Sequence, residues 1–255
     1  MWVIRMSEWP SRPLLNCAKL HRRGVPLALA FAALLAAPLR AQALETPGEQ
    51  VLRELRAARA AGQEGRCVAL LGEIGELHRF PASDAEAHAL LRAAGDATRD
   101  GNQAVVVAAL RALGATGAPG AGAHVEPFLR AAKPPVGQER AMVAAVRAAG
   151  ELRLSAHVPA LFKLANKCPD LTVADQALRA LGAFCVADVA QRKHVTGKVL
   201  EVCQSLRRRR ARWRRLRAPG LRALQRLTGR RLNRVSQFAD WWSYRKNLRD
   251  PFRVD

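Results

Sequence analysis

A short helical phrase recurs five times along the chain, and this recurrence constrains the fold more than any other feature. The phrase is clearest as ALRALG at residues 109–114 and again at 177–182. Each copy has a second small or apolar residue three positions after its inner leucine or valine, so both side chains lie on one face of a helix. A single such helix cannot bury this face, and recurrence at intervals of 32 to 46 residues predicts stacked repeats. The five aligned positions are Leu71, Leu110, Val146, Leu178 and Leu224.

A glycine directly follows four of the five copies, at Gly75, Gly114, Gly150 and Gly182, whereas the fifth has Thr228 and then Gly229. Glycine adopts the left-handed conformation without steric cost, so we expect these glycines to stop each helix. Between copies there is room for a loop and a second helix, as at residues 124–132 and 157–165. The predicted unit is therefore helix, loop, helix, and the predicted fold class is all-α.

At these residues the chain resembles the HEAT-repeat family, including its short PBS-lyase HEAT-like variety. The matching phrases are the two ALRALG segments and VPAL at 158–161, and residues 64–206 carry most of the resemblance. The segment FADWWSYRKN at 238–247, after LQRLTG, is similar to the closing helix of secreted bacterial HEAT-repeat proteins. The resemblance implies a right-handed α-α superhelix, a HEAT/ARM-like solenoid of about four to five helical pairs, whose concave face binds macromolecules, most often proteins.

The first 43 residues have the features of a bacterial export signal. Basic residues precede the apolar run 25–39, and Ala41 and Ala43 supply the small residues that signal peptidase reads. We therefore expect residues 1–43 to be a signal peptide and the protein to be periplasmic or secreted. The alternative is an uncleaved signal that anchors the protein in the membrane. The remaining chain divides into an N-terminal capping helix (44–62), HEAT-like repeats (63–206) and a basic, Arg/Trp-rich C-terminal repeat with a closing helix (207–255).

The positive charge of the chain is concentrated in its C-terminal fifth. Residues 44–201 contain 19 basic and 17 acidic side chains, whereas residues 202–255 contain 17 basic and 3 acidic side chains. Like charges at this density repel one another, which suggests an anionic partner such as anionic lipid, lipopolysaccharide or nucleic acid. The simpler interpretation is a solvated basic face. The residues proposed for polyanion binding are Arg207, Arg208, Arg209, Arg210, Arg212, Arg214, Arg215 and Arg217.

Motifs for catalysis, cofactors or metals are not found in the sequence. The histidines lack metal-ligand spacing, and His124 and His157 occupy matching places in their repeats, which indicates a structural role at a helix start. Export would place the cysteines in an oxidising compartment, where Cys185 and Cys203 could form a disulfide. The alternative is that the cysteines are buried apolar residues.

These features predict a non-catalytic HEAT-repeat scaffold in the cell envelope that binds a macromolecular partner, with a protein as the expected partner. One alternative is binding of a polyanion or a membrane surface through the basic C-terminal region. A HEAT-like lyase is a further alternative, which only the repeat phrase supports. No small-molecule substrate, cofactor or metal ligand is expected.

Overall fold

The computed structural model describes residues 45–131 and 133–253, and this part of the chain is all-α, as predicted. The expected signal peptide at 1–43 lies outside the described residues. The elements are α2 (Pro47–Ala60), α3 (Glu64–Leu77), α4 (Asp84–Ala97), α5 (Gln103–Thr116), η1 (Pro119–Ala121), α6 (Gly122–Arg130), α7 (Glu139–Leu152), η2 (Ser155–His157), α8 (Val158–Lys167), α9 (Leu171–Gly182), η3 (Ala183–Val186), α10 (Val189–Arg208), α11 (Arg210–Thr228) and α12 (Val235–Arg245).

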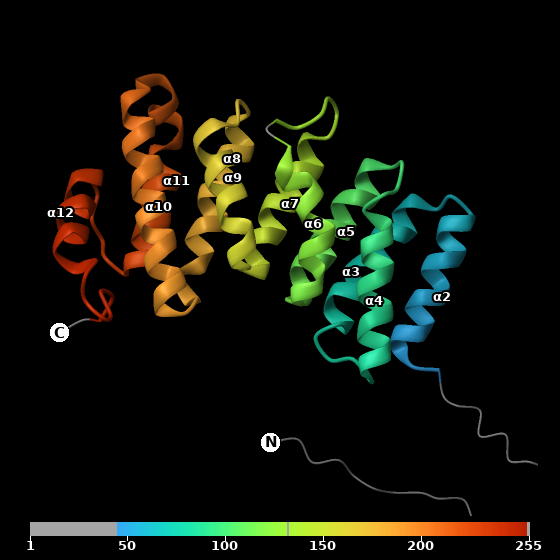
Figure 1. The fold of residues 1–255 in the computed structure, drawn as a ribbon. Coiled ribbons are helices and arrows are strands. Elements are labelled where there is room, and N and C mark those ends of the chain that lie inside the picture. Colours follow the sequence, from blue (N-terminus) through green and yellow to red (C-terminus); the bar gives the residue numbers. More distant parts are fainter. Residues whose placement is uncertain (1–44, 132, 254–255) are drawn as a thin grey trace, which may run out of the picture. The chain divides into compact units, whose positions relative to one another are not determined.

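The helices of the unit 45–255 form two rows (Figure 1). Each odd-numbered helix from α3 to α11 packs against the next odd-numbered helix, and each carries one copy of the repeated phrase. Each even-numbered helix from α2 to α10 packs on the odd-numbered helix that follows it, which makes five helical pairs, and α12 packs on α10. Helix α2 occupies the stretch expected for the capping helix and contacts α3 and α4. The tight pairs therefore begin with the even-numbered helix, not with the phrase helix that we expected to open each unit.

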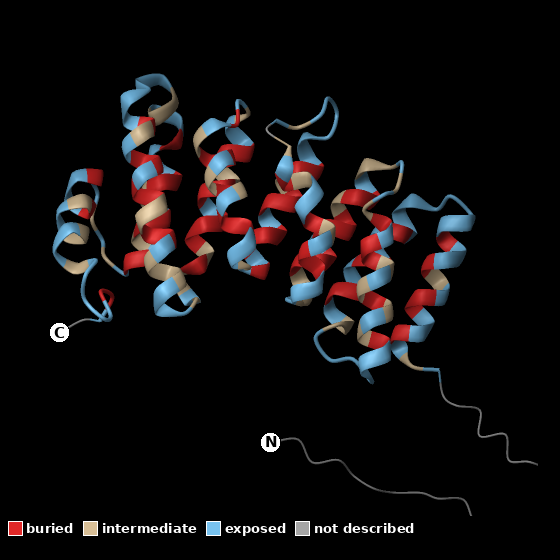
Figure 2. Ribbon diagram, in the orientation of Figure 1, coloured by how far each residue is buried: buried red, intermediate tan, exposed pale blue. Residues whose placement is uncertain are grey.

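The residues on which the five copies align are all buried. Leu71, Leu110, Val146 and Leu178 are fully buried, and Leu224 is 1% exposed. Buried positions lie along the facing sides of the helices, and exposed positions lie on their outer sides (Figure 2). Burial of each leucine contributes about 1.5–3 kcal/mol. The hydrophobic periodicity of the sequence therefore identifies the core correctly.

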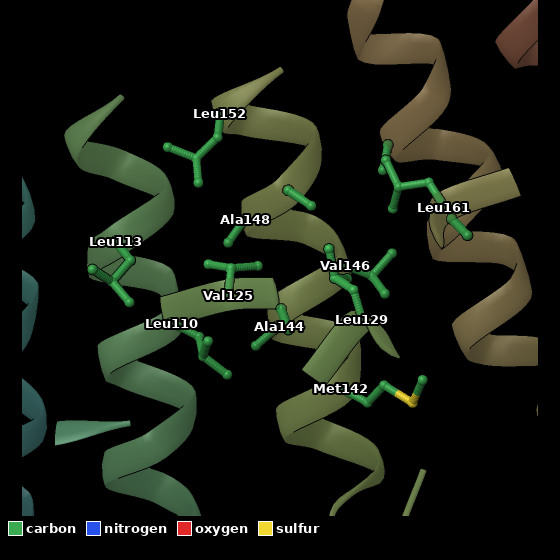
Figure 3. Close-up of a cluster of buried hydrophobic side chains, with 14 of the residues drawn as sticks. Leu110, Leu113, Val125, Leu129, Met142, Ala144, Val146, Ala148, Leu152 and Leu161 are labelled. Carbon is green, nitrogen blue, oxygen red and sulfur yellow. The ribbon is translucent and has the colours of Figure 1, made fainter. Parts of the chain in front are cut away.

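Two adjacent pairs show how the rows share this core. Figure 3 shows side chains of three helices in one buried cluster: Leu110 and Leu113 of α5, Val125 and Leu129 of α6, and Val146 of α7. All five side chains are at most 2% exposed. An even-numbered helix thus inserts its apolar side between two consecutive odd-numbered helices, so each phrase helix is covered by neighbours on two sides.

The glycines of the phrase act differently from the prediction. Gly75, Gly114 and Gly150 lie inside their helices, Gly182 is the last residue of α9, and none of the four has a positive φ. The predicted left-handed helix stop is therefore wrong for these four copies. Only the fifth copy behaves as expected, since Gly229 ends α11 with a φ of 70°.

Each of these four glycines instead lies against an alanine of the next odd-numbered helix. A Cβ atom added to Gly150 would lie 2.7 Å from the Cα atom of Ala180, and one added to Gly114 would lie 2.9 Å from the Cα atom of Ala148. Gly75 faces Ala112 and Gly182 faces Ala223 in the same way. The missing side chain therefore allows close helix packing, and it repeats because each junction in the odd-numbered row uses it.

We predict opposite effects for two glycine-to-alanine substitutions. Gly150→Ala should destabilise the protein by about 1–3 kcal/mol, because the new methyl group overlaps Ala180. Gly72→Ala is the matched control: Gly72 is exposed inside α3 with nothing within 4 Å of an added Cβ atom. Its replacement should stabilise the helix by up to about 1 kcal/mol. Urea unfolding measures both values, and stabilisation by both substitutions would contradict the packing role.

Histidines make a similar contact in the even-numbered row. The ring of His124 on α6 faces Gly95 on α4, and the ring of His157, just before α8, faces Gly122 at the start of α6. His157 is 4% exposed, and its Nδ1 atom is buried without a hydrogen-bond partner. Burial lowers the pKa of His157, and the Gly122 backbone and Glu126 offset this shift only in part. Burial therefore favours the neutral imidazole in the folded protein.

His157 should make the protein less stable in mild acid. Because its pKa is lower in the folded than in the unfolded chain, only the unfolded state gains a proton as the pH falls below about 6.5. The free energy of unfolding should therefore decrease toward the lower, folded pKa. In His157→Leu this decrease should be smaller by up to about 1 kcal/mol. Chemical unfolding at pH 7.5 and pH 5 tests this, and an unchanged pH dependence would show that His157 does not contribute.

Candidate binding surfaces

A groove of about 960 Å³ runs along the odd-numbered row. Residues from α3, α5, α7, η3 and α11 line it, so it spans most of the repeats. The lining residues are Val68, Gly72, Glu76, Arg79, Ala108, Arg111, Ala112, Gly114, Ala115, Gly117, Arg147, Gly150, Glu151, Arg153, Ala183, Cys185, Val186 and Arg226.

The lining of the groove includes many of the small residues that pack the odd-numbered helices together. Ala112, Gly114 and Gly150 all take part in the contacts between successive helices. Such positions cannot carry long side chains, because the neighbouring helix occupies the space beside them. The groove is therefore lined partly by residues that also form the helix contacts.

Arginines outnumber carboxylates around this groove by five to two. Arg147 donates from Nε to Glu151 Oε1 at 2.9 Å, and Arg79 pairs with Glu76 at 3.3 Å. The other three arginines, Arg111, Arg153 and Arg226, make no ion pair within the described residues. The groove therefore has an uncompensated positive charge supplied by three separate elements.

The sequence contained a signal for this arrangement that we did not use. Arg111, Arg147 and Arg179 each directly follow the inner leucine or valine of their phrase, so they hold the same position on consecutive odd-numbered helices. Arg179 is paired with Asp175 and does not line the groove. Within a single helix, such arginines resemble an ordinary solvated face. When the repeats are aligned, the shared position of these arginines indicates one side of the odd-numbered row.

Two exposed valines are among the residues that line the groove. Val68 lies on α3, and Val186, in η3, is 67% exposed. Scattered exposed apolar residues are normal on a protein surface, but these two share a hollow with unpaired arginines. The groove therefore offers both charged and apolar contacts to a ligand.

The eight arginines predicted to bind polyanions cluster around the turn from α10 to α11, but they do not form one site. Arg209 donates to the carbonyl of Asn166 at 3.2 Å and to its side-chain Oδ1 at 2.8 Å, and Arg212 donates to the carbonyl of Cys168. Burial lowers the pKa of Arg212, and the charge of Arg209 lowers it further. These two arginines hold the turn against the end of α8.

The other six arginines are exposed. Arg207 and Arg217 line one cavity, which also includes Trp213 and Arg234. Trp213 and Arg234 were not among the predicted site residues, because the position of the turn at Arg209 is not evident from the sequence. The remaining four, Arg208, Arg210, Arg214 and Arg215, lie on the surface outside this cavity.

The two tryptophans of α12 pack with Phe252. Trp241 and Trp242 lie with ring centroids 6.0 Å apart, and Trp242 stacks on Phe252 at 6.3 Å. The guanidinium of Arg192 lies 4.0 Å from the centroid of the Phe252 ring and donates to the carbonyl of Leu227 at 2.6 Å. This cluster fastens the C-terminal segment onto α10, so these aromatic rings serve packing.

All four cysteines in the described part of the chain are free thiols, and the bridge considered between Cys185 and Cys203 is not present in the structure. Burial raises the pKa of Cys203 to about 12, so its thiol stays protonated.

Within residues 45–131 and 133–253, no group of three His, Cys, Asp or Glu side chains is placed to hold a metal ion. None of the described helices combines the length and apolar character needed to cross a membrane.

Arg212 and Arg214 should differ in their contribution to stability. Arg212→Met should lower the free energy of unfolding by about 1–2 kcal/mol, because the carbonyl of Cys168 loses its charged donor. Arg214→Met keeps the same apolar stem and removes the same charge, but Arg214 is exposed, so its effect should stay within about 0.5 kcal/mol. Thermal unfolding compares the two variants, and equal effects would show that the Arg212 contact is not stabilising.

Comparison of this chain with family models, with curated proteins and with solved structures finds no match. The functional assignment therefore depends on the residues and geometry described above.

Proposed function

We propose that this protein is a non-catalytic scaffold that holds an extended, acidic segment of a partner protein in the groove of its odd-numbered helices. The observation that carries the proposal is the lining of this groove, where Arg111, Arg153 and Arg226 lack carboxylate partners among the described residues. Acidic side chains would supply the missing counter-charge, and Val68 and Val186 would contact apolar residues beside them.

The groove suits an extended chain better than a compact small molecule. Packed helices lie about 8–10 Å apart, so a ligand that crosses from α3 to α11 must span roughly 32–40 Å. A peptide of about 12 residues covers this distance when it is extended. Side-chain contacts would dominate such binding, because the helices that line the groove have already paired most of their backbone groups.

We propose a HEAT/ARM-like right-handed superhelical solenoid, supported by the stacking of one phrase helix per pair and by the Gly–Ala contact at successive junctions. The resemblance of ALRALG and VPAL to HEAT-like repeats supports the same assignment. A location in the cell envelope rests on residues 1–43 alone.

A second candidate function is supported by the charge distribution. The eight ion pairs of the described residues all lie between Glu45 and Glu201, so none compensates the thirteen arginines between Val202 and Ala239. This region could bind an anionic surface, whether lipid, lipopolysaccharide or nucleic acid. A HEAT-like lyase stays the weakest alternative, because no described cluster suggests a catalytic role.

The groove assignment predicts charge-dependent peptide binding at defined residues. A fluorescent peptide of about 12 residues that alternates glutamate with leucine should bind the full chain. Replacing Arg111, Arg153 and Arg226 together by glutamine should weaken this binding at least about tenfold, equivalent to about 1.4 kcal/mol. Fluorescence anisotropy measures the affinity across a salt series.

The control for this experiment removes the same charge elsewhere. Arg214, Arg215 and Arg222 are exposed on α11 and do not line the groove, so their replacement by glutamine should change the affinity less than about twofold. Equal losses in the two triple variants would mean that the peptide responds only to net charge. That outcome would contradict the groove assignment and favour the basic C-terminal region.

A further inference from the structure

A separate cavity lies where α10, α11 and the start of α12 meet. It has a volume of about 240 Å³ and is lined by Arg207, Trp213, Arg217, Leu221, Asn233 and Arg234, with Val235 and Ser236 at the start of α12. This cavity shares no lining residue with the groove of the odd-numbered helices. Its ligand must therefore be considered independently of the proposed partner.

Three arginines are among the residues that line this small space, and no carboxylate lines it. The three arginines come from the end of α10, from α11 and from the segment before α12, so the fold brings together charges that repel one another. None of the three forms an ion pair within the described residues. An anion in the cavity would relieve this repulsion.

The backbone adds to the positive character of the cavity. Helix α12 has 11 residues, and no side-chain oxygen of its N-cap residue, Arg234, accepts from its first turn. Gln237 Oε1 instead accepts from the backbone N–H groups of Asn233 and Arg234, at 3.3 and 3.1 Å. The positive end of the helix dipole therefore lies beside Val235 and Ser236, which line the cavity.

The shape and lining of the cavity favour one compact anionic group. Arginine donates in a planar fork that matches the oxygens of a phosphate, and three such forks can surround a tetrahedral anion. Trp213 and Leu221 add an apolar wall on one side, suited to a carbon substituent on the anion. An extended nucleic-acid backbone needs a continuous basic track with several phosphate positions, whereas this cavity has room for one group.

We propose that this cavity binds a terminal phosphate group, with Arg207, Arg217 and Arg234 as its ligands and Trp213 beside its substituent. The group could belong to a phosphomonoester lipid or to a small soluble phosphate. Both present the same dianion to the arginines, and they differ in what contacts the apolar wall.

Binding of inorganic phosphate to the full chain tests the site directly. Phosphate should raise the melting temperature above that in sodium chloride of equal ionic strength, and calorimetric titration should give a saturable affinity. The double variant Arg217→Gln and Arg234→Gln should lose at least about tenfold in affinity, because two of three forks are removed. The double variant Arg208→Gln and Arg215→Gln has the same net charge but leaves the cavity intact, and it should stay within about twofold.

Further binding measurements identify the source of the phosphate and define the results that would overturn the proposal. Soluble short-chain phosphatidic acid should bind more tightly than inorganic phosphate if the natural ligand is a lipid headgroup, and Trp213→Ala should remove that difference. Equal affinities would support a small soluble phosphate. Equal losses in the two double variants, or tighter binding of a single-stranded oligonucleotide without terminal phosphates, would overturn the assignment. Because the four replaced arginines are exposed, unchanged melting in chloride should show that both variants fold.

Discussion

The close contact between a glycine and an alanine on successive odd-numbered helices is the constraint on which the rest of this fold depends. At the junction of α7 and α9, a methyl group on Gly150 would lie within 2.8 Å of Ala180, so the backbones approach as closely as side-chain sterics permit. The same contact recurs at the three other junctions of the odd-numbered row. It sets how deeply leucines such as Leu110 and Leu178 are covered, because helices that were further apart would leave gaps around them.

The residues of this packing also take part in the candidate groove. Ala112, Gly114 and Gly150 lie at contacts between successive odd-numbered helices and also line the groove. Arg111 and Arg147 line it too, and they hold the same repeat position on α5 and α7. One sequence repeat therefore produces both the core and a row of charged side chains beside it. The carboxylate of Glu151 compensates Arg147, whereas Arg111 has no such neighbour.

The sequence predicted the helical class and the core well, because hydrophobic periodicity is a local property that survives in any stacking of these helices. It did not reveal what Gly114 or Gly150 do, since a glycine at a phrase end is equally consistent with a left-handed turn and with a close contact. The two uses differ only in three dimensions: Gly117, three residues after Gly114, is the residue that ends α5 with a φ of 65°. The cavity near Arg207 could not be predicted either, because its lining depends on where α10 turns into α11.

Three arginines that donate hydrogen bonds within the fold share one type of acceptor. Arg209 and Arg212 donate to carbonyls of Asn166 and Cys168 at the end of α8, and Arg192 donates to the carbonyl of Leu227 in the last turn of α11. Carbonyls at the end of a helix lack intrahelical donors and carry the negative end of its dipole, so they stabilise a guanidinium without a carboxylate. This explains how a segment with no acidic residue between Val202 and Ala239 can pack at all. Only a few helix ends lie within reach of these arginines, however. Other arginines, such as Arg207 and Arg217, therefore stay uncompensated within the fold. This is the condition under which an external anion binds best.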